Sequence, residues 1–194
     1  MVSAIGDCTF RPIATNDIVV IHSWMDGAEM QAKMEDQALT SKEITAKLAG
    51  LVGQDPVRDR QGAYIIEHEG RQIGFVHLYW INWISRTGEV DLMVDPALHR
   101  SFRSFWVVAK AGEVAFEFLN LNKVYAYVYA SNLDSIGMFR RLLGVEAVQP
   151  AGRRPPEGDE DVYIVGLTAA TYRARKRRLT WTRERRAAGE AVAR

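Results

Sequence analysis

The feature that most constrains the fold is a helical pattern set between two strand patterns in the middle of the chain. Residues 87–94 and 123–130 are rich in the β-branched and aromatic side chains that strands favour. Between them, apolar residues recur at the spacing of one helical face, at Val107, Ala111, Val114, Ala115 and Phe118. A strand, a helix and a second strand in this order predict an α/β domain.

The rest of the chain extends this unit on both sides. Alternating or β-branched runs predict seven strands, over 8–13, 63–67, 72–80, 87–94, 123–130, 145–148 and 161–167. Helical spacing and capping residues predict four helices, over 15–27, 40–52, 105–119 and 132–142. Gly144 stands where a helix C-cap glycine belongs, and a Gly/Pro-rich loop spans 152–158. The order predicts a mixed, mostly antiparallel sheet of about seven strands, flanked by helices.

Composition favours one globular domain in the cytoplasm. The chain has 194 residues, of which 47% are hydrophobic and 25% charged, enough to bury a core. No apolar run approaches the roughly 20 residues of a membrane span, and the first residues do not resemble a signal peptide. Cys8 has no second cysteine in the chain to pair with, and the four histidines show no metal-ligand spacing. We therefore expect neither a membrane partner nor a metal.

Charge divides the chain into an acidic body and a basic tail. Residues 167–194 hold nine basic and two acidic residues, a net charge of +7, whereas residues 1–166 carry −6. Such a tail suggests an electrostatic partner such as nucleic acid; the alternative is a solvated terminal helix. We expect a catalytic or binding domain over 1–166 and a basic, helical tail over 167–194.

Five short phrases, in this order along the chain, resemble the GNAT superfamily of N-acetyltransferases, most closely its ribosomal-protein and sugar-amine acetyltransferase-like branch. They are Ile73-Gly74-Phe75-Val76, Thr87-Gly88-Glu89-Val90, Val94-Asp95-Pro96, Leu121-Asn122-Lys123-Val124-Tyr125 and Ser131-Asn132-Leu133-Asp134-Ser135-Ile136. The resemblance implies a sheet splayed between its fourth and fifth strands, with acetyl-CoA or another acyl-CoA in the gap. It also implies an acyltransferase that acts directly on a primary amine of a small molecule. The oligomeric state stays open between a monomer and a homodimer, because exposed strand edges and the terminal helix would allow a dimer.

One loop departs from the pattern of that family. Its members carry a glycine-containing loop, Gln/Arg-x-x-Gly-x-Gly/Ala, whose backbone N–H groups hold the cofactor pyrophosphate at a helix N-terminus. Here residues 99–105 contain no glycine, and Arg100 and Phe102 take the place of small residues. In one reading Arg100 or Arg103 replaces some backbone donors by charge-assisted contacts. The resemblance assigns carrier contacts to Met93, Val94, His99, Arg100, Ser101, Phe102, Arg103, Ser104, Asn132 and Ser135.

In the other reading the acyl carrier is an aminoacyl-tRNA, which some GNAT-like proteins of secondary metabolism use as donor. Arg100 and Arg103 lie beside Phe102, Phe105 and Trp106, a mixture of cations and aromatic rings suited to single-stranded nucleic acid. The tail would extend such a surface through Arg173, Arg175, Lys176, Arg177 and Arg178. A third reading keeps the fold as a non-catalytic binding module.

Two carboxylates are the catalytic candidates. Glu89 and Asp91 are two residues apart on one strand and therefore project from the same face. The resemblance implies that Glu89 accepts a proton from the amine, often through water, and that Asp91 supports it. Phe139 stands where the family often has a general-acid tyrosine, so Ser135 or water would protonate the leaving group. The residues expected to wall the acceptor pocket are Trp24, Trp80, Trp83 and Tyr127; the acceptor itself is not identified by the sequence.

Overall fold

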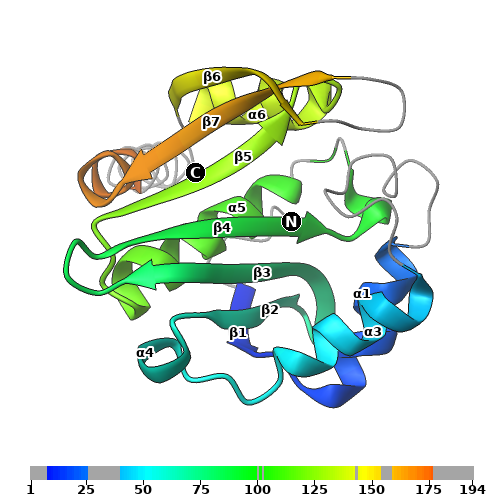
Figure 1. Ribbon diagram of the computed structural model, residues 1–194. Helices are drawn as coiled ribbons and strands as arrows, with labels where there is room; N and C mark the ends of the chain where they lie inside the picture. Colours follow the sequence, from blue (N-terminus) through cyan, green and yellow to red (C-terminus); the bar gives the residue numbers. More distant parts are fainter. Residues whose placement is uncertain are drawn as a thin grey trace, which may run out of the picture.

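A single seven-stranded sheet organises the computed structural model, which describes residues 8–25, 40–99, 101, 103–142, 144–153 and 159–176 (Figure 1). The strands are β1 (Cys8–Pro12), β2 (Gly62–His68), β3 (Arg71–Asn82), β4 (Thr87–Val94), β5 (Lys123–Tyr129), β6 (Gly144–Arg153) and β7 (Glu160–Thr168). Their order across the sheet is β1-β2-β3-β4-β5-β7-β6. Only the β4–β5 pair is parallel; the others are antiparallel. The predicted mixed sheet is thus confirmed.

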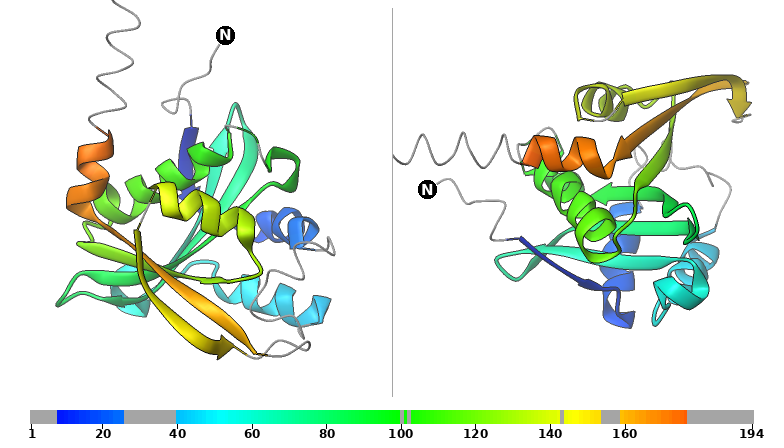
Figure 2. Two further views of the ribbon diagram at one scale, coloured as in Figure 1. Left: turned by 90° about the horizontal axis from the view of Figure 1, so that it is seen from above. Right: turned by 90° about the vertical axis from the view of Figure 1, so that its left-hand side faces the viewer.

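Helices cover both faces of this sheet (Figures 1 and 2). They are α1 (Ile18–Met25), α3 (Ser41–Gly50), the single turn α4 (Pro56–Asp59), α5 (Ser104–Glu113) and α6 (Leu133–Leu142), with a further helical segment over residues 169–176. The Thr40 hydroxyl accepts from the Glu43 N–H, and the Glu43 carboxylate accepts from the Thr40 N–H, so a capping box starts α3. In the described part of the chain no helix is long and apolar enough to cross a membrane.

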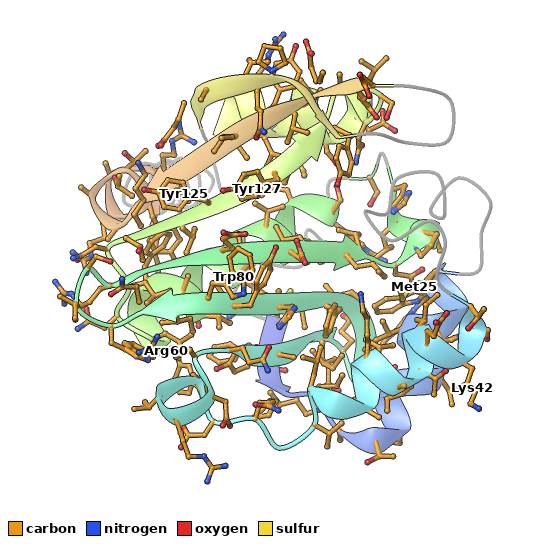
Figure 3. All side chains as sticks on the ribbon, viewed as in Figure 1. Met25, Lys42, Arg60, Trp80, Tyr125 and Tyr127 are labelled. Atoms are coloured by element: carbon orange, nitrogen blue, oxygen red, sulfur yellow. The ribbon has the colours of Figure 1, made fainter. Side chains whose placement is uncertain are left out.

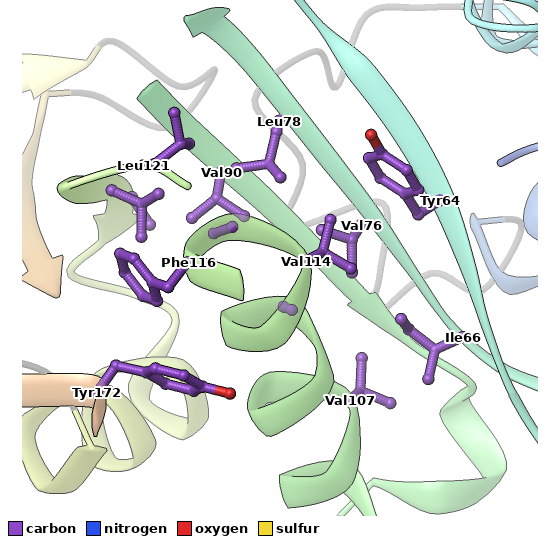
Figure 4. Packing of buried hydrophobic residues seen from close by; sticks show 14 of the residues in the cluster. Tyr64, Ile66, Val76, Leu78, Val90, Val107, Val114, Phe116, Leu121 and Tyr172 are labelled. Carbon is purple, nitrogen blue, oxygen red and sulfur yellow. The ribbon is translucent and has the colours of Figure 1, made fainter. Parts of the chain in front are cut away.

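The two faces of the sheet bury separate apolar clusters. On one face, side chains of the central strands pack against α5 and the helical segment after β7; Figure 4 shows Val76, Leu78 and Val90 facing Val114 and Phe116. Among the described residues, the other face is covered at one end, where α1 and α3 pack over β2 and β3 through a cluster that reaches Phe75. The buried residues of this cluster include none from β4 or β5, so this part of the sheet is a candidate location for a site.

A two-residue turn sets the register of the first hairpin. Glu69 and Gly70 both have positive φ angles, 52° and 74°, as a type I′ turn requires. His68 therefore pairs with Arg71, and a register shift between Ile66 and Glu67 then places Gly74 opposite Ile66 on β2. A Cβ at Gly74 would lie 2.5 Å from a methyl carbon of Val107, so the absence of a side chain allows α5 to approach the sheet.

Two local predictions are corrected by the structure. Gly144 is the first residue of β6, so it belongs to a strand and not to a helix cap. The helix predicted over 105–119 ends as an α-helix at Glu113 and continues as a wider π-helical turn over Val114–Phe118. This turn rotates Phe118 out of the apolar stripe, so that the side chain is 60% exposed.

One set of hydrogen bonds, at Asp17, and one packing contact, at Tyr172, attach the first and last described segments to the rest of the fold. Asp17, fully buried after β1, accepts from Arg11 at 2.6 and 2.7 Å and from Gln72 of β3. Tyr172, in the segment after β7, packs on α5, where a Cβ at Gly112 would lie 2.6 Å from its ring. Both contacts join segments distant in sequence, so we expect them to matter for stability.

Candidate functional site

A gap opens in the sheet where β4 and β5 diverge. The two parallel strands pair only at their beginnings, over Thr87–Lys123, Gly88–Val124 and Glu89–Tyr125. Beyond these pairs β5 stays bound along its whole length to β7, while β4 stays bound to β3. The backbone of β4 after Glu89 therefore has no partner in β5, as predicted for a sheet splayed between its fourth and fifth strands (Figure 1).

Two carboxylates lie on the uncovered face beside this gap. Glu89 is directly opposite Tyr79 on β3 and Tyr125 on β5, and Asp91 is directly opposite His77. Since paired residues project from the same face of a sheet, both carboxylates stand among these rings. Glu89 is half-buried and Asp91 is exposed, and the Tyr79 hydroxyl lies 3.4 Å from Oδ1 of Asp91.

Aromatic side chains surround the carboxylates (Figure 3). Trp80 is 75% exposed and has a φ of 49°, and the β3–β4 register shifts between Tyr79 and Asn82, as at a β-bulge. Figure 3 shows Trp80 over the paired strands β3 and β4, with Tyr125 and Tyr127 on the neighbouring strand β5, where Tyr125 belongs to the last pair before the gap. The result is an open surface that combines aromatic faces with negative charge, a combination that attracts organic cations.

Two titratable rings at this surface are neutral near pH 7. Burial lowers the pKa of His77 to about 4, and its ring stacks between Phe75 and Tyr79 at centroid distances of 6.5 and 4.9 Å. Burial and then the negative charge of Glu89 raise the pKa of Tyr127, whose side chain is 46% exposed. Tyr127 therefore keeps its proton, and Glu89 lies near enough to affect it.

The amino end of α5 follows directly from the carboxyl end of β4. Asp95 accepts from Arg71 at 2.6 Å and from the Ala97 N–H, which anchors the connection. Arg103, the N-cap residue of α5, makes no side-chain capping hydrogen bond, and its own N–H donates to the Ser101 hydroxyl at 3.2 Å. The hydroxyls of Ser101 and Ser104 both donate to backbone carbonyls, of Leu98 and Ser101, and so shape this turn.

The predicted carrier residues on this connection are only partly described. Arg103 is exposed, and its guanidinium lies 5.9 Å from the centre of the Trp106 ring. His99 contacts the Val94 carbonyl at 3.2 Å. Arg100 and Phe102 lie outside the described residues. The structure thus shows a helix N-terminus with one cation at the end of β4, an arrangement suited to an anion.

Helix α6 contributes the other predicted carrier residues. The Asn132 side chain accepts from the Ser135 backbone N–H at 3.2 Å and so caps the helix. Ser135 is half-buried, and within the described residues its hydroxyl has no hydrogen bond. Phe139 is 6% exposed in the core. Met93 and Val94, at the end of β4, are half-buried.

Other predicted residues lie away from the carboxylates. Trp24 is buried between α1 and the sheet, 7% exposed. The Trp83 indole N–H donates to the Pro56 carbonyl at 3.2 Å, beside α4. Lys176 forms an ion pair with Glu117 at 2.6 Å, at the far end of the helix that starts near Arg103. Arg173 and Arg175 lie with Lys176 in the helical segment after β7, and Arg177 and Arg178 lie outside the described residues.

The sequence pattern offers Tyr79 as part of an aromatic turn that either walls the acceptor pocket or only packs, but His77 and Tyr125 are not among the predicted site residues. The signal was available, because positions 75, 77 and 79 alternate on one strand and 125 and 127 on another. What the sequence alone does not give is the pairing that aligns these positions with Glu89 and Asp91. In the described part of the chain, no cluster of His, Cys, Asp and Glu could hold a metal ion.

Comparisons with known proteins agree with this geometry. A family model described as an acetyltransferase (GNAT) domain matches residues 7–143. Spermidine N(1)-acetyltransferase of Escherichia coli K12 is 23% identical over 132 residues, which cover 68% of this chain and 69% of that protein. A structure of spermidine N-acetyltransferase from Vibrio cholerae in complex with CoA and spermine has a TM-score of 0.73, with 19% identity, covering 86% of this chain and 98% of that one. A chimera of the Vibrio cholerae enzyme with hSSAT, 20% identical, also gives 0.73, covering 86% of this chain and 98% of that one.

Proposed function

Because the chain belongs to the GNAT acetyltransferase family and is an N-acyltransferase, we propose that it transfers an acetyl group from acetyl-CoA to a primary amine of a small, cationic molecule. The transfer takes place on the uncovered face beside the gap between β4 and β5. The observation that carries the proposal is the pair of carboxylates, Glu89 and Asp91, set among aromatic rings at this gap. A protonated amine is attracted by such a surface before it reacts.

The residues around the gap fit the carrier. The amino end of α5 and the cation of Arg103 suit the phosphates, and the unpaired edge of β4 after Glu89 offers backbone N–H and C=O groups to the amide-rich arm of CoA. Met93 and Val94 lie on the same strand, and Asn132 and Ser135 start the helix after β5. When bound, acetyl-CoA supplies a thioester carbonyl that is activated for attack by an amine.

The chain's own residues then position the amine and move its protons. Asp91 and the rings of Tyr79 and Trp80 hold the cationic acceptor near the gap. Glu89 accepts a proton from the amine, directly or through water, so that the neutral nitrogen can attack. Backbone N–H groups on the free edge of β4 stabilise negative charge on the carbonyl oxygen. The Ser135 hydroxyl or water returns a proton to the thiolate, because Phe139 has none to give.

The acceptor class rests on the charge of the site and on the relatives. The relatives reported above are named for spermidine, an aliphatic amine with several positive charges. The exposed Asp91 and the half-buried Glu89 provide two negative groups for such a chain, and the rings provide apolar contact. We therefore propose polyamines and related aliphatic diamines as the first acceptors to test.

The experiment is a transfer assay with acetyl-CoA and a panel of amines, followed by mass spectrometry of the products. Cationic diamines and polyamines should be acetylated in preference to neutral amides and to amino acids that carry a carboxylate. Asp91→Asn should raise the KM for the amine more than it lowers kcat. Acetylation of anionic and cationic amines at equal rates would contradict the proposed acceptor class.

In the described part of the chain, no observation favours the aminoacyl-tRNA donor, with a nucleic-acid surface running from Arg103 to the tail, over the CoA donor. Lys176 forms an ion pair with Glu117. Arg103 precedes Glu117 by about 14 residues on the helix that includes α5, so the two cations are separated by roughly 21 Å at the helical rise per residue. Titration with charged tRNA beside acetyl-CoA compares the two donors directly.

A further inference from the structure

A cavity lies beside α4 and the β3–β4 turn, away from the gap between β4 and β5. Its volume is about 430 Å³, within the range of sites for small molecules. The residues that line it come from the end of β1, the turn α4, the start of β2, the β3–β4 turn and the end of the π-helical turn. They are Pro12, Gln54, Asp55, Pro56, Val57, Gly62, Ala63, Tyr64, Trp83, Phe118 and Leu119. None of these lining residues belongs to β4, β5 or α6, so the cavity is separate from the acetyl-transfer site.

Three aromatic side chains form its walls and are held in place by protein contacts. The Trp83 indole N–H donates to the Pro56 carbonyl at 3.2 Å, which fixes the ring beside α4. Tyr64 and Phe118 meet edge to face with a centroid distance of 6.0 Å. Phe118 is 60% exposed because the π-helical turn rotates it outward. Trp83, one of the predicted acceptor residues, thus faces this cavity.

Two polar groups are available in these walls. Tyr64 is 3% exposed and lies at the edge of the core cluster (Figure 4). Burial and then the negative charge of Asp55 raise its pKa to about 12, so the hydroxyl keeps its proton and the carboxylate is near. Oδ1 of Asp55 accepts from the Val57 N–H at 2.9 Å. Within the described residues, neither the Tyr64 hydroxyl nor Oδ2 of Asp55 has a hydrogen-bond partner.

The geometry points to this cavity as a binding site for a small monoamine with an aromatic or branched aliphatic body. The rings and prolines accept the apolar body, and the faces of Trp83 and Phe118 attract an adjacent cation. The ammonium group donates hydrogen bonds to the Asp55 carboxylate and the Tyr64 hydroxyl. An anion would be repelled by Asp55, and a polyamine would find one carboxylate among the lining residues for its several charges.

The test is calorimetric titration of the full chain, without acetyl-CoA, with 2-phenylethylamine as the probe. We expect a Kd below about 1 mM, as is usual for a ligand of this size that fills an apolar site. The neutral isostere 2-phenylethanol should bind about tenfold more weakly, because it lacks the charge. Phenylacetate should show no binding. Tighter binding by spermidine than by 2-phenylethylamine, or equal binding by the alcohol, would overturn the assignment.

Three variants test whether the amine binds in this cavity. Asp55→Asn removes the charge but keeps an N-cap acceptor for Val57, so the turn should fold, and we expect a Kd about fivefold to tenfold higher. Tyr64→Phe keeps the ring and should raise the Kd about threefold or more. Asp59→Asn is the matched control: it removes a neighbouring charge that is not in the cavity wall, while its amide oxygen can still accept from the Asp55 N–H as the carboxylate does at 2.8 Å, so the Kd should change less than about twofold.

A second readout separates this cavity from the acetyl-transfer site. The indole N–H signal of Trp83, identified with Trp83→Phe, should shift on adding 2-phenylethylamine in the wild type and equally in Glu89→Gln. A shift and a heat signal that both vanish in Glu89→Gln and persist in Asp55→Asn would show that the amine binds beside the gap instead. Failure of the proposed acetyl transfer would leave these results unchanged.

Discussion

Replacing Glu89 with glutamine removes one negative charge from the transfer site and little else. The side chain is half-buried on β4, opposite Tyr79 and Tyr125, and glutamine has nearly the same shape. If Glu89 takes the proton of the amine, kcat should fall by about 10² or more, the usual contribution of a positioned base. That loss corresponds to about 2.7 kcal/mol in the activation barrier.

The same variant has a spectroscopic consequence that is independent of turnover. The pKa of Tyr127 is raised by burial and then by the negative charge of Glu89, so Glu89→Gln should lower it. The measurement is a spectrophotometric titration of tyrosinate, with Tyr127→Phe in each background to identify the signal. A lower pKa shows that the two side chains are as close as the structure places them.

Asp91→Asn is the control for charge alone. Asp91 is exposed and two residues along the same strand, so its loss should cost less kcat than the loss of Glu89. Rates are measured with saturating acetyl-CoA and amine, and folding is checked by thermal denaturation. Unchanged turnover in Glu89→Gln under these conditions would refute the proton-transfer role and leave Glu89 as a surface charge.

Three further predictions concern stability. Asp17→Ala should lower the free energy of unfolding by about 1.5–3 kcal/mol in urea denaturation, because it removes the charge-assisted hydrogen bonds from Arg11 and Gln72, while Arg11, 35% exposed, keeps its ion pair with Glu67. Burial lowers the pKa of His77 in the folded state from 6.5 to about 4, so wild-type stability should fall as the pH drops from 6.5 towards 4. This histidine accounts for up to about 3 kcal/mol of that loss, and urea denaturation of His77→Gln should show a smaller loss between the same pH values. Gly112→Ala, which forces a methyl group against Tyr172, should cost about 1–3 kcal/mol and lower Tm, while acetyl transfer at low temperature persists.

The fold could be predicted from the sequence where local pattern and tertiary structure agree. The strand over Thr87–Val94 was predicted with the bounds that the structure has, because its alternation is regular and Asp95-Pro96 ends it. The prediction for Gly144 is wrong because a glycine after a helix suggests a left-handed cap, whereas Gly144 is the first residue of β6. The π-helical turn at Val114–Phe118 has no sequence signal in an apolar stripe.

The candidate site could likewise be predicted from the sequence only in part. Glu89 and Asp91 could be chosen from one strand and a family resemblance, because both residues are local to it. Trp83 could not be placed, since its indole N–H bonds to the Pro56 carbonyl, and that contact depends on how α4 packs against the hairpin turn. The aromatic neighbours depend on strand register, which no single segment contains.

The most direct test of the account is amine-dependent release of CoA from acetyl-CoA, measured in the wild type and in Glu89→Gln, with the acetylated product identified by mass spectrometry. The account predicts that the wild type acetylates a cationic primary amine and that Glu89→Gln does so about 10² times more slowly at the same acetyl-CoA affinity. It would be contradicted by a protein that binds acetyl-CoA but acetylates no amine in the panel, or by one whose rate does not depend on Glu89.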